Sequence, residues 1–180
     1  ISFGNFLIKR VVDELKRDFP ALRNFATLSP VPGFARWLQS PPASEVMLPA
    51  SVQSKLKRAG MEPASARELW SAVDGRGWNR DPKLAQAIEE PMLFACAHYL
   101  AEARNGLRPL DAVARFHLDN GARIERLNWL ADTSEKGMKQ SVGIMVNYVY
   151  DPAEIERNHE SYRLHGKVAL SSELRRLLRR

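Results

Sequence analysis

The chain has 180 residues, of which 44% are hydrophobic and 27% charged, a balance typical of one globular domain that can bury a core. Its single cysteine, Cys96, excludes a disulfide framework and a cysteine-rich zinc site, and it fits a reducing compartment. The sequence shows neither an apolar run long enough to span a membrane nor a secretory leader, so we expect no membrane partner.

The net charge of +6 raises the question of a nucleic-acid partner. Cations and acids are mixed along the chain, except in the final stretch SSELRRLLRR. That stretch predicts an amphipathic helix with Leu174, Leu177 and Leu178 facing inward and arginines near its C-terminal end, where cations are favourable. No zinc-finger spacing accompanies it, and a polyanionic small molecule explains the charge equally well. We therefore expect no nucleic-acid partner.

A core-facing helix is predicted over residues 6–17, because apolar residues recur every fourth position on one side and charged residues fill the other. Pro20 ends it. Ser2 and Gly4 lie at its N-terminus, where unpaired N–H groups favour a phosphate. Since the chain begins at Ile1, we expect a fragment or a domain of a longer protein.

Residues 25–28 predict a short buried strand, which Pro30 and Pro32 prevent from continuing. Ser29 then lies at the end of this strand, close to the helix N-terminus, and its hydroxyl could take part in chemistry. A serine before a proline is also a common turn residue, and the pattern alone leaves this alternative open.

The segment from 43 to 107 has a helical pattern, and the predicted helices cover residues 49–59, 64–73 and 82–104. Asp81 is a suitable N-cap for the last of these, with Pro82 in its first turn. Pro91 is expected to interrupt that helix, and Asn105-Gly106 is a typical C-terminal pair.

A β-hairpin is predicted from residues 112–118 and 123–130, joined by the turn Asn120-Gly121. Side chains alternate between the faces of a strand, so one face would be an apolar layer. The opposite, mixed face would carry Val113, Arg115, His117, Ile124, Arg126 and Asn128. A shift of one residue in register would reverse the two faces.

A long helix is predicted over residues 135–148, because the preceding Asp132-Thr133-Ser134 is a capping cluster and apolar residues follow at helical spacing. The same N-terminus could bind an anion, although a cap explains it as well. A polar helix is expected to end near Tyr162, before the basic tail.

Common catalytic motifs are missing from the sequence: it contains no HExxH pair, no GxSxG elbow and no Walker loop. A catalytic metal is therefore not expected. Ser29 and His117 remain as candidates for chemistry. Spacing alone cannot bring them together, and a histidine in a sheet can equally have a structural role.

Four stretches carry a resemblance to a known family: SFGNFLIKRVVDELKRDFP, FATLSPVPGFARWL, EEPMLFACAHYLAEARNG and ARFHLDNGARIERLNWLADTSEKGMKQSVGIMVNYVYD. In order and over most of the chain they closely resemble malonyl-CoA decarboxylase, whereas residues 40–83 and the tail match less distinctly. The resemblance implies an α+β fold: a partial, GNAT-like mixed sheet with a β-hairpin, surrounded by helices and carrying a helical insertion. It also implies that residues 1–180 are a single unit, the later part of the catalytic domain, without the family's N-terminal helical domain.

The resemblance also assigns roles to residues. The family's catalytic serine falls on Ser29 in LSPVPGF, its catalytic histidine on His117 in RFHLDNG, and a supporting tyrosine on Tyr150 in NYVYD. The opening helix would receive the CoA pyrophosphate. The expected substrate-binding residues are Ser2, Phe3, Gly4, Asn5 and Asn128. Animal members carry a glutamate where this chain has Ser2.

The activity implied is decarboxylation of malonyl-CoA to acetyl-CoA. It needs no cofactor, because the thioester carbonyl itself accepts the electrons, and no metal. Ser29 would handle the carboxylate and His117 would supply the proton. The alternatives are a GNAT-type CoA-dependent acyltransferase and, in another class, a non-enzymatic basic binding module. We further expect a homo-oligomer of the full-length protein and, since the ending LLRR is not a peroxisomal signal, a bacterial cytoplasmic location.

Overall fold

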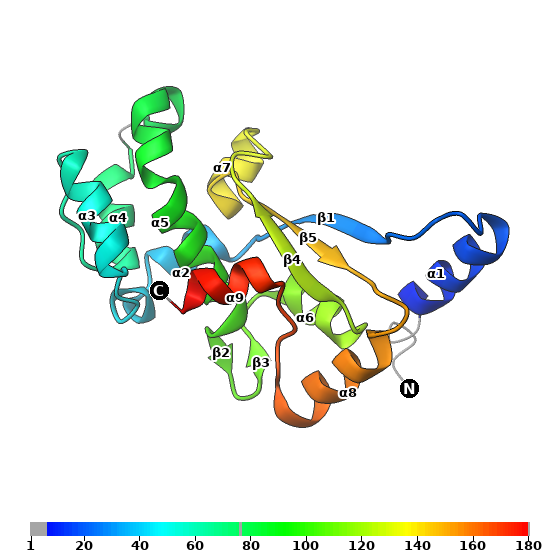
Figure 1. The fold of residues 1–180 in the computed structure, drawn as a ribbon. Coiled ribbons are helices and arrows are strands. Elements are labelled where there is room, and N and C mark those ends of the chain that lie inside the picture. Colours follow the sequence, from blue (N-terminus) through cyan, green and yellow to red (C-terminus); the bar gives the residue numbers. More distant parts are fainter. Residues whose placement is uncertain (1–6, 76, 180) are drawn as a thin grey trace.

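The computed structural model describes residues 7–75 and 77–179. It is an α+β fold in which helices flank a three-stranded sheet (Figure 1). The strands are β1 (Ala26–Pro30), β5 (Met145–Val149) and β4 (Arg123–Asn128), in the order β1-β5-β4 and antiparallel to one another. The α+β class is therefore confirmed. The three-stranded sheet is antiparallel where a mixed sheet was expected, and among the described residues parallel pairing is limited to an isolated bridge between Ile124 and Leu170.

The two faces of this sheet differ in burial. Ser29, Val146 and Tyr148 lie on one face and are buried, whereas Leu28 and Asn147 alternate with them and lie on the other. A β-bulge at Glu125 shifts the alternation in β4, so that Ile124 and Leu127 both face the buried side. No described helix covers the side that carries Leu28, which is 55% exposed (Figure 1).

The helical insertion follows β1 and comprises α2 (Phe34–Leu38), η2 (Pro41–Ser44), α3 (Ala50–Arg58), α4 (Ala66–Val73), η3 (Trp78–Arg80) and α5 (Pro82–Ala101). Asp81 caps α5 as predicted, because its carboxylate accepts the N–H groups of Lys83 and Leu84 at 3.0 and 3.2 Å. Pro91 does not interrupt α5, which runs through it. The helix also ends earlier than predicted: Asn105 is the last residue of β2 (Arg104–Asn105), and Gly106 and Leu107 form the turn to β3 (Arg108–Pro109).

The predicted β-hairpin at residues 112–130 is wrong. Its first half is a helix, α6 (Ala112–Asp119), and only its second half is a strand. Asp111 caps this helix by accepting the N–H groups of Val113 and Ala114 at 3.0 and 2.9 Å. Asn120 is its C-cap, and Gly121 follows with φ of +78°. The Asn-Gly pair therefore ends a helix here, as it commonly does, instead of turning a hairpin.

The predicted helix over residues 135–148 is also wrong in its second half. The structure has a short helix, α7 (Glu135–Ser141), followed by β5. Val142 and Gly143 both have positive φ, +55° and +76°, and a helix cannot continue through this conformation. The apolar residues beyond them belong to the central strand of the sheet.

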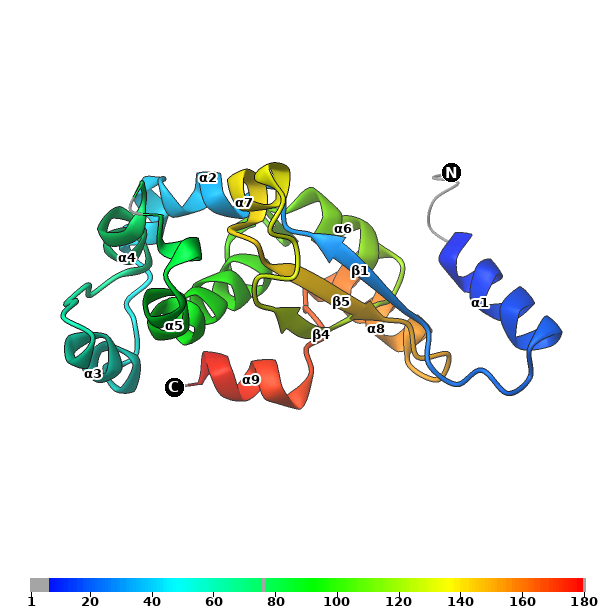
Figure 2. The ribbon, with the colours of Figure 1, turned by 90° about the horizontal axis from the view of Figure 1, so that it is seen from above.

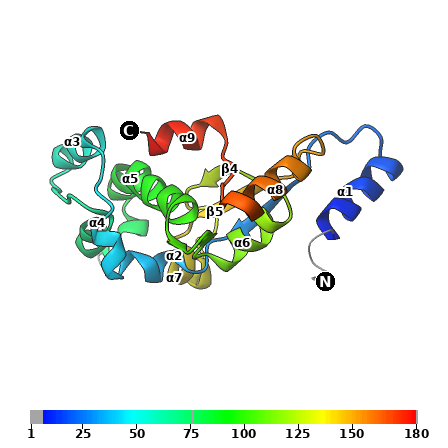
Figure 3. The same cartoon turned by 90° about the horizontal axis from the view of Figure 1, so that it is seen from below.

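The remaining helices are α1 (Leu7–Asp18), α8 (Ile155–His165) and α9 (Ser172–Leu178), which confirm the predicted opening, polar and terminal helices. Viewed from below, α6 and α8 lie under the sheet (Figure 3). α1 stands apart from the sheet (Figure 2), and the ion pair of Lys9 with Glu156 joins it to α8. Its apolar side was expected to face the core, yet Leu7 is 55% exposed. No helix in the described part of the chain is long and apolar enough to cross a membrane.

Candidate active site

The hydroxyl of Ser29 and the imidazole of His117 meet at the buried face of the sheet. Ser29 is near the end of β1, opposite Val146 of β5, and its side chain points toward α6. Its Oγ lies 3.0 Å from Nε2 of His117, a residue 88 positions later in the chain. The two candidates are thus brought together, although His117 comes from a helix and not from the predicted hairpin.

Tyr150 contacts the other nitrogen of the same imidazole. Its hydroxyl is 2.5 Å from Nδ1 of His117. The backbone places it there, because Tyr150 directly follows β5 and its N–H donates to the carbonyl of Phe25 at 2.8 Å. The three side chains therefore form a continuous line of hydrogen bonds, Tyr150 to His117 to Ser29.

A second tyrosine, Tyr148, packs flat against the imidazole. The ring centroids of Tyr148 and His117 are 4.1 Å apart, with an angle of 16° between the planes. Its hydroxyl is buried and has no hydrogen-bond partner within the described residues. Sequence reasoning missed this contact because Tyr148 was assigned to a helix. The period of two between Tyr148 and Tyr150 was the signal that both side chains share one face of a strand.

Burial sets the protonation state of the site. Ser29, His117 and Tyr150 are only 8%, 6% and 2% exposed. Because a charged imidazole loses hydration there, burial lowers the pKa of His117 to about 4. Burial likewise raises the pKa of Tyr150 above its ordinary value. Both side chains are therefore neutral near pH 7.

The hydrogen-bond pattern favours one tautomer of His117. Ser29 donates its proton to Oγ1 of Thr27 at 3.3 Å, so its oxygen is left to accept from Nε2–H of His117. Nδ1 then carries no proton and accepts from the hydroxyl of Tyr150. The hydroxyl of Tyr150, Nε2–H of His117 and the hydroxyl of Ser29 thus donate in one direction, which ends at Thr27.

A buried carboxylate supports the elements that carry Ser29 and His117. Asp111, 1% exposed, caps α6 with one oxygen, while its other oxygen is buried. Burial raises the pKa of Asp111. At Gly33, just beyond β1, an added Cβ would lie 2.2 Å from the hydroxyl of Tyr99 and 3.7 Å from the second oxygen of Asp111. The turn after Ser29 and the start of the histidine helix are thus packed tightly together.

Of the predicted substrate-binding residues, Asn128 lies in the described part of the chain. Ser2, Phe3, Gly4 and Asn5 lie outside the described residues. Asn128 was predicted to share a face with His117, and this is wrong. The bulge at Glu125 reverses the alternation of side chains in β4, so that Asn128 lies on the opposite side of the sheet. Its amide instead donates to Oδ1 of Asn147 at 2.8 Å, on the open side of the sheet. A binding role for Asn128 stays a prediction.

Metal ligands and the single cysteine also bear on the expected chemistry. Across residues 7–75 and 77–179, no three His, Cys, Asp or Glu side chains are gathered in a way that could hold a metal ion. Cys96 is fully buried in α5, and burial raises the pKa of its thiol, so it is a neutral core residue.

Comparisons with known proteins agree on one family. The model of the malonyl-CoA decarboxylase C-terminal domain matches residues 1–180. The mitochondrial malonyl-CoA decarboxylase of Rattus norvegicus is 38% identical over 181 residues, which cover 96% of this chain and 36% of that protein. The chain thus spans about a third of the length of the curated relatives it matches.

Solved structures give the same result. The crystal structure of malonyl-CoA decarboxylase from Cupriavidus metallidurans matches with a TM-score of 0.83 and 40% identity, over 99% of this chain and 44% of that one. The structure from Rhodopseudomonas palustris matches with a TM-score of 0.82 and 44% identity, over 98% of this chain and 38% of that one. The chain belongs to the malonyl-CoA decarboxylase family.

Proposed function

We propose that the protein containing this chain decarboxylates malonyl-CoA to acetyl-CoA and carbon dioxide, with Ser29 and His117 at the reacting centre. The observation that carries the proposal is the buried line of hydrogen bonds from Tyr150 through His117 to Ser29. Relatives that bear the name malonyl-CoA decarboxylase support it.

The reaction breaks the bond between the carboxylate carbon and the adjacent methylene carbon. The electron pair of that bond moves toward the thioester carbonyl and gives an enolate, while carbon dioxide leaves. A proton must then be added to the methylene carbon. No electron-accepting cofactor is needed, because the thioester carbonyl takes that role itself, and we propose that the enzyme uses none.

Ser29 would donate a hydrogen bond to the malonyl carboxylate or to the departing carbon dioxide. His117 would orient Ser29 and supply the proton to carbon, directly or through a water molecule. The negative substrate favours the protonated imidazole, so its binding would raise the low pKa of His117 toward a useful range. Tyr150, on Nδ1, would fix the ring in one orientation.

The remaining features of the proposal come from the family resemblance. Substrate would be held by Ser2, Phe3, Gly4, Asn5 and Asn128, with the CoA pyrophosphate at the N-terminus of the opening helix. The chain would be the later, GNAT-like part of the catalytic domain in a homo-oligomer. We place the protein in a bacterial cytoplasm, which is consistent with its structural neighbours from bacteria.

The test is a mass measurement of the products formed by the full-length protein from malonyl-CoA. We expect acetyl-CoA and carbon dioxide in equal amounts, whether or not an amine acceptor is present. A malonylated amine, formed without release of carbon dioxide, would contradict the proposal and indicate an acyltransferase.

A further inference from the structure

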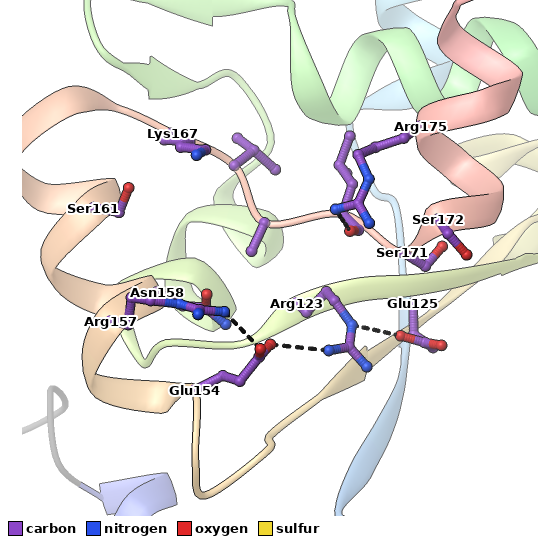
Figure 4. A pocket seen from close by; sticks show the side chains of 13 residues that line it. Arg123, Glu125, Glu154, Arg157, Asn158, Ser161, Lys167, Ser171, Ser172 and Arg175 are labelled. Carbon is purple, nitrogen blue, oxygen red and sulfur yellow. Dashed lines mark hydrogen bonds and ion pairs between the residues drawn. The ribbon is translucent and has the colours of Figure 1, made fainter.

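A basic pocket lies beside β4, at the edge of the sheet (Figure 4). The N–H of Ile124 donates to the carbonyl of Ala169, and its carbonyl accepts from the N–H of Ser171, both at 2.9 Å. The segment 167–171 therefore runs beside β4, and the pocket opens between this segment, α8 and α9. Ser29 is on β1, two strands away, or about 10 Å at the usual strand spacing.

Four cationic side chains from different elements line this basic pocket: Arg123, Arg157, Lys167 and Arg175. Its two acids are already engaged with two of them. Glu125 pairs with Arg123 at 2.7 Å, and Glu154 joins Arg123 and Arg157 at 3.1 and 2.5 Å. The lining as a whole has a net charge of +2.

Lys167 and Arg175 carry the positive charges of the pocket that are not paired with an acid. Neither forms an ion pair within the described residues, and Arg175 donates one N–H to the carbonyl of Leu170 at 2.7 Å, which leaves its other donors available. Figure 4 shows both side chains on the rim formed by the segment 167–171 and α9. The hydroxyls of Ser161 and Ser172 also line the pocket and form no hydrogen bond within the described part of the chain.

The size and lining of the pocket indicate the class of ligand. Its volume of about 660 Å³ exceeds that needed for a free inorganic ion and falls in the range of small-molecule sites. Val168, Ala169 and Leu170 give it an apolar wall beside the charged groups. Arginine, lysine and hydroxyl donors suit phosphate oxygens, and a phosphate monoester near pH 7 carries close to two negative charges.

We propose that the basic pocket is a binding site for a phosphate monoester of nucleotide size, separate from the Ser29–His117 site. Lys167 and Arg175 contact the phosphate, and the apolar wall contacts the organic part. This site does not depend on the proposed decarboxylation, because it shares none of the residues assigned to that reaction.

The test is calorimetric titration of the full-length protein with AMP, using adenosine and inorganic phosphate as matched probes. We expect AMP to bind, inorganic phosphate to bind more weakly, and adenosine not to bind. The double variant Lys167→Gln/Arg175→Gln should weaken AMP binding by about tenfold or more. The control Arg176→Gln/Arg179→Gln removes the same charge from exposed positions of the same terminal region. It should change the affinity for AMP by less than about twofold.

Three outcomes would overturn the proposal. AMP could fail to bind the wild-type protein up to about 10 mM, a concentration that corresponds to negligible affinity. The two double variants could weaken binding equally, which would reflect net charge alone. Finally, Lys167→Gln/Arg175→Gln could raise the KM for malonyl-CoA about tenfold, which would assign the pocket to the CoA substrate. A KM within about twofold of wild type supports a separate site.

Discussion

Replacing Tyr150 with phenylalanine tests the line of hydrogen bonds in the candidate active site. Its hydroxyl lies 2.5 Å from Nδ1 of His117, and both side chains are almost completely buried. The change leaves a buried imidazole nitrogen without its partner, at a cost of about 1–3 kcal/mol. If this hydrogen bond also holds the ring in its reactive tautomer, kcat should fall about 10- to 100-fold.

Tyr148 offers a matched control. Its ring stacks on the same imidazole, but its hydroxyl has no partner within the described residues. Tyr148→Phe removes the same atom and keeps the stacked ring, so kcat should change by less than about twofold. Both variants should be assayed by the release of carbon dioxide from malonyl-CoA, with KM measured in parallel. Equal losses in the two variants, or wild-type turnover in Tyr150→Phe, would refute the reasoning.

Three further predictions follow from the contacts around this site. Asp111→Ala removes the cap of α6 and should lower the free energy of unfolding by about 1–2 kcal/mol. Asp111→Asn keeps a capping oxygen, so it should lower the free energy of unfolding by less; thermal denaturation of both variants measures the difference. Gly121→Ala should destabilise by more than about 1 kcal/mol, because φ is +78° and the new Cβ would lie 2.2 Å from the carbonyl oxygen of Ile155; unchanged stability would refute this. Burial lowers the pKa of His117 from 6.5 to about 4, so the unfolded chain takes up a proton first as pH falls. The stability that comes from the neutral imidazole is complete above about pH 6.5 and is lost toward pH 4; in urea unfolding, this loss should be about 3 kcal/mol larger in wild type than in His117→Gln.

Much of the helical framework could be predicted from local signals. Asp81 followed by Pro82 marked the start of α5, and the apolar positions of the tail marked α9. These signals are reliable because capping groups and one-sided apolar patterns act within a few residues. The passage of α5 through Pro91 could not be predicted in this way, since the packing of that buried residue comes from distant parts of the chain.

The segment around His117 shows where local patterns compete. Alternation in residues 112–118 and the Asn120-Gly121 pair favoured a hairpin, but Asp111 is an N-cap and Gly121 ends a helix. Both interpretations satisfy the local sequence, and packing of α6 against the sheet selects the helix. The bulge at Glu125 then determines which face each residue of β4 occupies, and this explains why Asn128 is not beside His117.

The sequence indicates which residues form the candidate site but not how they are arranged in space. Residue patterns indicated Ser29 and His117 as candidates and the family resemblance added Tyr150, whereas no spacing in the sequence indicated that these side chains touch. Their meeting depends on two antiparallel strands and a helix that are far apart in the chain. Tyr148 escaped notice because the positive φ values at Val142 and Gly143, which end α7, cannot be read from apolar spacing.

The most direct test of the central claim is a double-mutant cycle on Ser29 and His117 in the full-length protein, with kcat for carbon dioxide release as the readout. If the two side chains act as one unit on the malonyl carboxylate, Ser29→Ala and His117→Ala should each lower kcat by about 10³-fold, and the double variant should be no slower than the worse single variant. Turnover near wild type in either single variant, or fully multiplicative losses in the double variant, would contradict the account.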